Sequence, residues 1–115
     1  FMSECLFCKI RDGEIPGDIV YENDHVLAFN DINPVAPTHI LIIPKEHIST
    51  LNDLEENHTK TMGEIFLAAK ELASREGFAE SGYRTIFNCN EHGQQTVFHI
   101  HLHLIGGRQM SWPPG

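Results

Sequence analysis

The chain has 115 residues, of which 41% are hydrophobic and 21% are charged. These are ordinary values for a globular protein, so they exclude intrinsic disorder and fibrous classes and predict a single domain over residues 1–115. Sixteen acidic residues against eight basic ones give a formal net charge of −8 at pH 7. This charge opposes binding to duplex nucleic acid but leaves room for a small phosphate ester.

We find no sign of a membrane anchor or a secretory leader. No apolar run approaches the roughly 20 residues that a transmembrane helix needs. The opening Phe1-Met2-Ser3 lacks the basic and apolar regions of a signal peptide. We therefore expect no membrane association and a cytoplasmic location, with the nucleus as a second compartment.

The cysteines are three in number, which does not fit a disulfide framework. Cys5 and Cys8 form a C-x-x-C pair, a pattern typical of half a metal site or of a redox pair. Cys89 is expected to be a small core residue.

The first half of the chain predicts a short helix and three strands. Residues 6–10 have apolar positions suited to a helix, which Asp12-Gly13 and Pro16-Gly17 end. Residues 19–21 and 26–29 predict the two strands of a hairpin around a polar turn. Pro34 and Pro37 keep the next loop extended, and the apolar run 40–43 predicts a central strand.

The second half predicts one long helix and two more strands. Apolar residues recur at helical spacing over residues 55–76, and Gly77 is placed to end that helix. Residues 83–89 predict a strand, residues 90–95 a polar loop, and residues 97–105 the last strand. Five strands with one long and one short helix predict an α+β fold with an antiparallel sheet.

The last predicted strand carries three histidines, His99, His101 and His103, that alternate with aliphatic residues. Successive side chains of a strand point to opposite faces, so the three imidazoles should share one side. The aliphatic side, with Ile100 and Leu104, should pack against the long helix. Two functional interpretations remain open from the residues alone: a metal site, because a His-x-His pair can bind one zinc, or a nucleophilic imidazole beside an anion site.

The motif His99-φ-His101-φ-His103-φ-φ, in which φ is apolar, resembles the signature of the histidine triad (HIT) superfamily. Further stretches resemble its Hint branch, the purine nucleoside phosphoramidases, over nearly the whole chain. These are Phe29-Asn30-Asp31-Ile32, Ala36-Pro37-Thr38-His39, Ile43-Pro44-Lys45-Glu46-His47, Gln95-Thr96-Val97-Phe98, Gly106-Gly107-Arg108-Gln109 and Trp112-Pro113-Pro114-Gly115.

The resemblance implies a homodimer in which two five-stranded sheets join into one, and a pocket for a purine nucleoside monophosphate. Asp31 would hold the ribose hydroxyls, because an acceptor-only carboxylate suits a vicinal diol. The implied nucleotide contacts are Phe7, Ile10, Phe29, Asp31, Ile32, Leu41, Asn88, Gln94, Gln95, Thr96, Val97, His101 and His103. Gln94 stands where the family more often has glycine.

The catalytic roles that the resemblance implies fall on four residues. His101 would attack the α-phosphorus and form a covalent nucleotidyl-histidine, with its other ring nitrogen donating to the backbone carbonyl of His99. His103 and His39 would contact phosphate oxygens, and the hydroxyl of Thr96 would pass a proton to the departing amine. No cofactor is implied for this reaction.

A structural zinc is implied at Cys5, Cys8, His47 and His99, because zinc-bearing members of the family use ligands at the matching positions. Two thiolates and two imidazoles complete the closed tetrahedron of a structural zinc site.

The expected function is hydrolysis of purine nucleoside phosphoramidates to AMP or GMP and an amine. A nucleotide-binding regulatory protein whose hydrolysis is incidental is the alternative. A metal-dependent oxygenase or cupin-like site is a third interpretation, which lacks support because no carboxylate is placed as a facial-triad partner of the histidines.

Overall fold

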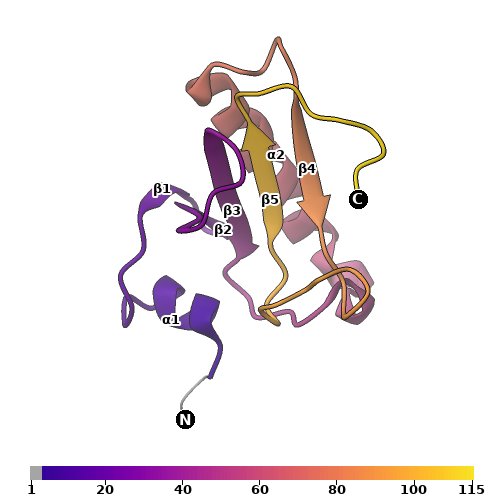
Figure 1. The fold of residues 1–115 in the computed structure, drawn as a ribbon. Coiled ribbons are helices and arrows are strands. Elements are labelled where there is room, and N and C mark those ends of the chain that lie inside the picture. The colour runs from indigo at the N-terminus through magenta and orange to yellow at the C-terminus, as the bar shows by residue number, and fades with distance from the viewer. Residues whose placement is uncertain (1–3) are drawn as a thin grey trace.

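The computed structural model describes residues 4–115, so the expectation drawn from Phe1-Met2-Ser3 lies outside the described residues. Figure 1 shows the arrangement of its helices and strands. In chain order they are α1 (Leu6–Arg11), β1 (Ile19–Glu22), β2 (Val26–Asn30), β3 (Thr38–Pro44), the 3-10 turns η1 (Leu51–Asp53) and η2 (Glu56–His58), α2 (Thr59–Glu76), β4 (Tyr83–Phe87) and β5 (Leu102–Gly106).

The five strands form one antiparallel sheet in the order β1-β2-β3-β5-β4. This confirms the predicted α+β class, with one long helix and a short N-terminal helix. The central strand β3 is paired on both sides, with β2 and with β5, and every residue from His39 to Pro44 is buried. The fully apolar run at its centre suits a strand covered on both faces.

Alternation along β2 and β3 divides the core between the two faces of the sheet. Val26, Ala28, Ile40 and Ile42 pack with α2, together with Leu102 and Leu104 of β5. The intervening residues Leu27, Phe29, Leu41 and Ile43 pack with Phe7 of α1. α1 is short and lies over only part of this face of the sheet (Figure 1).

Two element boundaries differ from the sequence prediction at the ends of the last two strands. β4 ends at Phe87 rather than at residue 89, shortly before Asn90 turns the chain with a φ of 59°. β5 begins at Leu102, so residues 97–101 are not strand. Before Leu102, other hydrogen bonds replace the backbone pairing with β3. The His99 ring bonds the Pro44 carbonyl at 2.8 Å, and the Ile100 N–H donates to Ile48 O at 2.8 Å.

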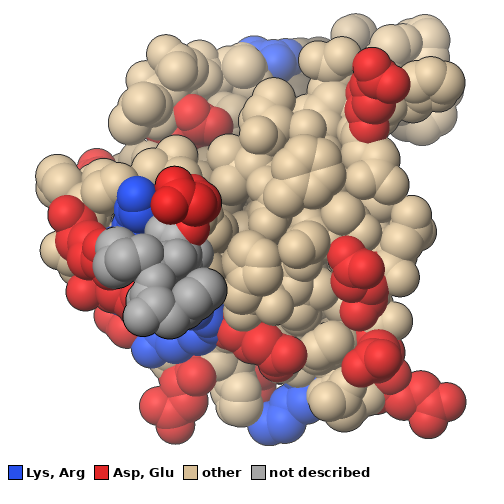
Figure 2. Space-filling model, turned by 90° about the horizontal axis from the view of Figure 1, so that it is seen from below, with Lys and Arg blue, Asp and Glu red and all other residues tan. Residues whose placement is uncertain are grey.

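The long helix begins at Thr59 rather than at residue 55, because residues 56–58 form the 3-10 turn η2. Its end agrees with the prediction: Gly77 follows it in the left-handed conformation, with a φ of 87°. Within residues 4–115, no helix is both long and apolar enough to cross a bilayer. Acidic side chains outnumber basic ones on the face seen from below (Figure 2), in line with the net charge of −8.

Candidate functional site

A cavity of about 290 Å³ lies between α1 and the sheet face opposite α2. Its volume is near the lower end of pockets that hold small molecules, about 300 Å³. The lining includes most of the predicted nucleotide contacts, from both ends of the chain: Phe7, Ile10, Phe29, Asp31, Ile32, Leu41, Thr96, Val97, His101 and His103.

One wall of this cavity is apolar. Phe7 and Phe29 meet edge to face with ring centroids 5.3 Å apart, and both are buried together with Leu41. Ile32 also lines the cavity and is 91% exposed, so a flat ring bound against the apolar wall would cover the Ile32 side chain. An apolar slot with a few polar groups at one end is the usual form of a nucleotide or cofactor site.

The sequence reasoning missed six further lining residues: Leu6, Ile15, Pro16, Gly17, Asp18 and Asn30. Asn30 donates to the Asp18 carboxylate at 2.8 Å, which ties β2 to the segment before β1. A Cβ atom on Gly17 would lie 2.9 Å from the Ile10 side chain, so a larger residue there would push on the cavity wall. The Pro16-Gly17 pair could have indicated this wall from the sequence, because such a pair marks a place where the backbone packs closely against a neighbouring segment as well as the end of a helix.

The His101 side chain is held with one ring nitrogen fixed and the other available. Nδ1 lies 2.8 Å from the backbone carbonyl of His99, and a carbonyl can only accept, so Nδ1 carries the proton. Burial lowers the pKa of His101, although the bond to the His99 carbonyl and the charge of Asp31 partly offset this. A neutral imidazole of this tautomer has an unprotonated Nε2, which is the atom a nucleophile needs.

His103, which is partly buried, and the buried His39 form a hydrogen-bonded pair next to His101. Nε2 of His39 lies 2.9 Å from Nδ1 of His103 and 3.4 Å from a carboxylate oxygen of Asp31. The ring centroids of His101 and His103 are 4.9 Å apart. Burial, helped by repulsion from His101 and His39, lowers the pKa of His103 to about 4, and burial also lowers the pKa of His39. His103 lines the cavity, whereas His39 is not among its lining residues.

Three other predicted contacts, Asn88, Gln94 and Gln95, are also absent from the lining. Gln95 is buried inside the loop, where its amide nitrogen donates to Ser49 O at 2.7 Å and to Val97 O at 3.1 Å. Its amide oxygen accepts from the Asn90 N–H at 2.9 Å. Gln94 is exposed and adopts a φ of 64°, a conformation that explains the preference for glycine at this position.

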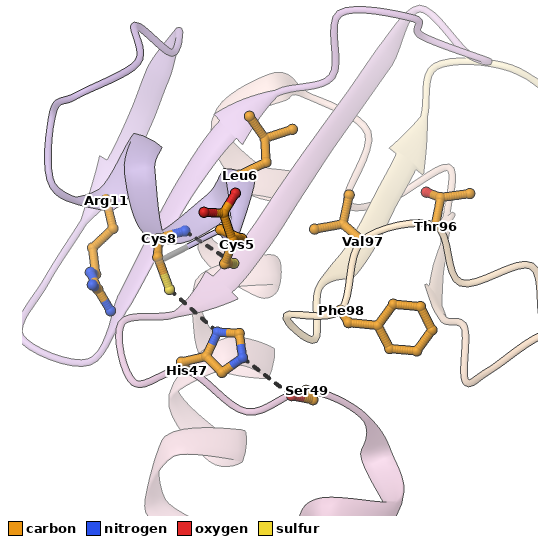
Figure 3. Close-up of a pocket in the computed structure, with 10 residues that line it drawn as sticks. Cys5, Leu6, Cys8, Arg11, His47, Ser49, Thr96, Val97 and Phe98 are labelled. Carbon is orange, nitrogen blue, oxygen red and sulfur yellow. Dashed lines mark hydrogen bonds between the residues drawn. The ribbon is translucent and has the colours of Figure 1, made fainter. Parts of the chain in front are cut away.

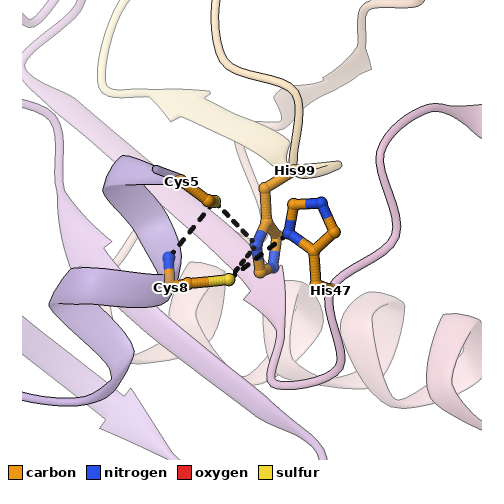
Figure 4. A group of neighbouring side chains, drawn as sticks. All are labelled: Cys5, Cys8, His47 and His99. Atoms are coloured by element: carbon orange, nitrogen blue, oxygen red, sulfur yellow. Dashed lines mark hydrogen bonds between the residues drawn. The ribbon is translucent and has the colours of Figure 1, made fainter. Parts of the chain in front are cut away.

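A second group of side chains gathers where α1 meets the loops that carry His47 and His99 (Figure 4). Cys5 caps the N-terminus of α1, Cys8 lies on its first turn, and His47 and His99 approach from the loops after β3 and before β5. The sulfur and ring nitrogen atoms all lie within 4.8 Å of one another. Nδ1 of His99 is 3.3 Å from the Cys5 sulfur, and Nδ1 of His47 is 3.3 Å from the Cys8 sulfur.

These four residues fit a tetrahedral metal ion. Nε2 of His99 donates to the Pro44 carbonyl at 2.8 Å, so the lone pair of its Nδ1 faces the sulfur atoms. Nε2 of His47 lies 3.2 Å from the Ser49 hydroxyl, which orients the second imidazole in the same way. Such outer partners are typical of metal-binding histidines. Burial lowers the pKa of His99 to about 4, and a neutral imidazole is the form that binds a metal.

An open groove of about 800 Å³ borders the same cluster (Figure 3). It is lined by Cys5, Cys8, His47 and Ser49, and by Thr96 and Val97, which also line the first cavity. The groove beside the metal-type cluster and the cavity therefore share Thr96 and Val97 as wall residues, and α1 contributes side chains to both.

Comparison with known proteins gives consistent results. The family model described as "Scavenger mRNA decapping enzyme C-term binding" matches residues 4–112. A purine nucleoside phosphoramidase of Escherichia coli strain K12 is 53% identical over 107 residues, covering 93% of this chain and 90% of that protein. A 14 kDa zinc-binding protein of Zea mays is 52% identical over 115 residues, covering 98% and 89%.

Among solved structures, a HIT family hydrolase from Legionella pneumophila Philadelphia 1 has a TM-score of 0.96 and 57% identity. The match covers 97% of this chain and all of that one. Relatives at this level of identity, matched over almost their full length, place the chain in their family, and the chain carries the three alternating histidines His99, His101 and His103, of which the last two line the cavity. The chain is therefore a member of the histidine triad (HIT) family, with Hint-type proteins among its relatives.

Proposed function

We propose that this chain hydrolyses purine nucleoside phosphoramidates, releasing AMP or GMP and an amine. The observation that carries the proposal is the His101 ring, whose Nδ1 is bonded to the His99 carbonyl so that Nε2 is unprotonated beside the cavity. The name of the Escherichia coli relative, purine nucleoside phosphoramidase, supports the same substrate class.

The proposed reaction proceeds through a covalent nucleotidyl-His101 intermediate. Nε2 forms a bond to the α-phosphorus while the P–N bond breaks, and the departing nitrogen takes a proton that the Thr96 hydroxyl relays from solvent; the water that attacks in the second step returns one proton to solvent. Water then attacks the phosphorus, the bond to Nε2 breaks, and AMP or GMP leaves. One water molecule is consumed, and His101 returns to its starting tautomer. Splitting the displacement in two lowers each barrier, because the imidazole is both a good nucleophile and a good leaving group.

We infer that the nucleotide lies with its base against the apolar wall and its ribose at Asp31. Phe7, Phe29 and Leu41 would bury the base, and Ile10 and Ile32 would close its edges. Asp31 accepts the Asn33 N–H at 2.8 Å through one oxygen, which orients the carboxylate and leaves acceptor capacity for the ribose hydroxyls. Backbone N–H groups around Thr96 would add donors for the phosphate.

We further infer that the Cys5, Cys8, His47 and His99 cluster binds a structural zinc ion and that catalysis itself uses no cofactor. The donor set, the orientation of both Nδ1 atoms and the name of the Zea mays relative support zinc. When bound, zinc would supply a rigid crosslink between α1 and the loops that carry His47 and His99, and it would take no part in the reaction.

A homodimer that joins two sheets through β4 is also proposed. β4 is one of the two edge strands of the sheet, the other being β1, and among the described strands it pairs only with β5. Exposed apolar side chains lie near this edge: Phe66 is 50% exposed and packs against Phe87 of β4 with ring centroids 6.0 Å apart. An unpaired edge strand beside apolar surface favours pairing with another chain. Light scattering at micromolar concentration should give twice the chain mass.

The deciding experiment measures turnover of adenosine 5′-phosphoramidate by the purified chain and by His101→Ala. We expect the variant to lose at least about a thousandfold in kcat and to keep its affinity for AMP within about tenfold, because a nucleophile contributes little to ground-state binding. Acid quenching is unsuitable for the intermediate, so single-turnover samples should be quenched in base and analysed for AMP on His101.

The same assay separates the enzyme from the alternative, a nucleotide-binding regulatory protein. Wild-type turnover no faster than buffer, with AMP bound tightly, would favour the binding protein. Full activity in His101→Ala would show that His101 is not the nucleophile.

A further inference from the structure

Asp18 and Asn30 line the cavity, but the proposed reaction gives neither of them a role. The Asn30 side-chain amide donates to Oδ2 of Asp18 at 2.8 Å, and the Asn30 backbone N–H donates to the Asp18 carbonyl at 3.1 Å. The backbone bond alone joins β2 to the segment before β1. The side-chain bond orients the carboxylate of Asp18 and leaves it capacity to accept from a ligand.

The register of the sheet places Asp18 at the end of the cavity that lies farthest from the histidines. His103 of β5 pairs with Leu41 of β3, which pairs with Phe29 of β2. Phe29 in turn pairs with Ile19, the residue that follows Asp18. Neighbouring strands lie about 4.8 Å apart, so this row from β5 to β1 spans about 14 Å. A nucleotide with its phosphate at His103 and its base over Phe29 therefore extends toward Asp18.

The edge of the base that faces Asp18 follows from how a purine is joined to its sugar. Ribose is attached at N9, so the opposite edge, with N1 and the groups on C2 and C6, points away from the ribose and the phosphate. Guanine has two donors side by side on this edge, the N1–H and the 2-amino group. Adenine has a lone pair on N1 and a single donor, the 6-amino group. A carboxylate can only accept, and its two oxygens match two parallel donors.

We propose that Asp18 selects guanine over adenine by accepting from the N1–H and the 2-amino group of the base, and that Asn30 is a positioning residue for its carboxylate. With adenine in the same place, a carboxylate oxygen would face the N1 lone pair and repel it. This inference rests on the proposed function for the place of the nucleotide in the cavity, and it narrows the substrate class to guanosine phosphoramidates.

The size of the effect follows from the position of Asp18 at the surface. A bidentate pair between a side chain and a base discriminates by about tenfold or more against the wrong base. Asp18 is exposed, so water competes for its oxygens, and we expect the lower value. A pair that served only to hold β1 beside β2 would affect all purine nucleotides alike. The ratio of dissociation constants for two bases therefore separates recognition from a structural role.

The test is isothermal titration calorimetry of the full chain with GMP, IMP and AMP at one ionic strength. IMP has the N1–H but no 2-amino group, so it supplies one of the two donors. We expect Kd to increase in the order GMP, IMP, AMP, with about tenfold between GMP and AMP. This comparison needs no variant, so it does not depend on how well a variant folds.

Two variants assign the selectivity to the proposed residues. In Asp18→Asn the amide offers one acceptor and one donor, so the dissociation constants for GMP and AMP should come within about threefold of each other. Asn30→Ala keeps the carboxylate but removes its orienting bond, so the order of the three nucleotides should persist with a smaller ratio between GMP and AMP.

Asp24→Asn is the matched control, because it removes the same charge from an exposed residue between β1 and β2 that does not line the cavity. The chain has a net charge of −8, so loss of any carboxylate weakens its repulsion of an anionic nucleotide. This general effect changes all three dissociation constants together. The ratio between GMP and AMP should therefore keep its wild-type value in Asp24→Asn.

Equal affinities of the wild type for GMP and AMP would overturn the proposal, and so would a wild-type ratio in Asp18→Asn. Failure of the proposed function looks different, because GMP would bind more tightly than AMP while guanosine and adenosine phosphoramidates both stayed uncleaved. Absence of binding by all three nucleotides would contradict both.

Discussion

His99 contacts the neighbouring His101 through its backbone and the cysteines through its side chain. Its carbonyl accepts from Nδ1 of His101 at 2.8 Å, while its own Nδ1 faces the sulfur atoms of Cys5 and Cys8 at 3.3 and 3.5 Å. One residue therefore orients the proposed nucleophile and belongs to the metal-type cluster. Any ion that fixes the His99 ring also fixes the carbonyl that determines the tautomer of His101.

The first prediction concerns the metal. Protein expressed with added zinc and purified without chelator should contain about one zinc per chain, and Cys5→Ser/Cys8→Ser should contain none. Because a site formed only in the folded state adds its binding free energy to stability, the double variant should lose at least about 4 °C in Tm, the shift that about 1 kcal/mol produces in a chain of this size. Elemental analysis and calorimetry provide the measurements.

Cys89→Ser is the matched control for that experiment, because Cys89 is a partly buried cysteine outside the cluster. It should keep its zinc. Less than about a tenth of an equivalent of zinc in the wild type would contradict the prediction.

The second prediction concerns Gln95, whose side chain joins three backbone groups of two segments. In Gln95→Glu the carboxylate can still accept from Asn90 but cannot donate to the Ser49 and Val97 carbonyls, which then face a negative charge. We expect faster amide hydrogen exchange in residues 90–97 and a loss of kcat of at least about tenfold, because a buried unpaired group costs about 1–3 kcal/mol.

Gln109→Ala serves as the control for Gln95, since within residues 4–115 the exposed Gln109 side chain bonds only the adjacent Met110 carbonyl, at 3.1 Å. It should leave hydrogen exchange of residues 90–97 unchanged. Unaltered exchange in Gln95→Glu would show that the loop keeps its shape without this side chain.

The third prediction follows from the pKa of His103, which burial lowers to about 4 from an ordinary value of 6.5. Between these two values the unfolded chain binds a proton at this residue and the folded chain does not. The free energy of unfolding should therefore fall as pH is lowered from 6.5 to 4, with no contribution from His103 to the pH dependence above 6.5.

Urea unfolding of wild type and of His103→Gln at pH 7, 5.5 and 4.5 measures this contribution. The wild type should take up about one more proton on unfolding than the variant within this window. Parallel stability curves for the two proteins would refute the assignment.

The fourth prediction concerns the C-terminal segment. Arg84 of β4 donates to Ser111 O at 2.9 Å, and its guanidinium lies 5.9 Å from the centre of the Trp112 ring, which is 79% exposed. We expect removal of residues 111–115 to change relative rates across a panel of AMP-amines more than it changes dimerisation. The expectation is that the tail reaches the partner's site, where an aromatic ring can contact the leaving group. An unchanged rate profile would contradict it.

The sequence was most informative where a pattern repeats. The apolar runs 26–29 and 40–43 predict strands, and the structure assigns successive residues of those runs to opposite faces of the sheet. The resemblance to the histidine triad family, and not a local pattern, predicted most of the cavity lining. Residue type and spacing are sufficient for the strands because an apolar run of strand length can be recognised within one short segment.

The sequence predictions fail where hydrogen bonds between residues far apart in the chain determine the local structure. Nothing near Gln95 in the sequence indicates that Ser49, 46 residues away, accepts from its amide. The strand before Leu102 is interrupted because the His99 ring, rather than a backbone N–H, bonds the Pro44 carbonyl. The orientation of the His39 ring depends on the Val35 N–H, which donates to its Nδ1, and every residue except proline has such a backbone group.

α1 has only six residues, yet Phe7 and Cys8 are adjacent on it and serve different sites. Phe7 forms part of the wall of the nucleotide cavity, and Cys8 belongs to the metal-type cluster. A ligand at either site holds the same helix in place, and such a coupling is reciprocal by thermodynamic necessity. Any factor by which zinc would tighten AMP binding must therefore equal the factor by which AMP would tighten zinc binding, so at equilibrium nucleotide-saturated protein should keep its zinc at a higher chelator concentration than the empty protein does.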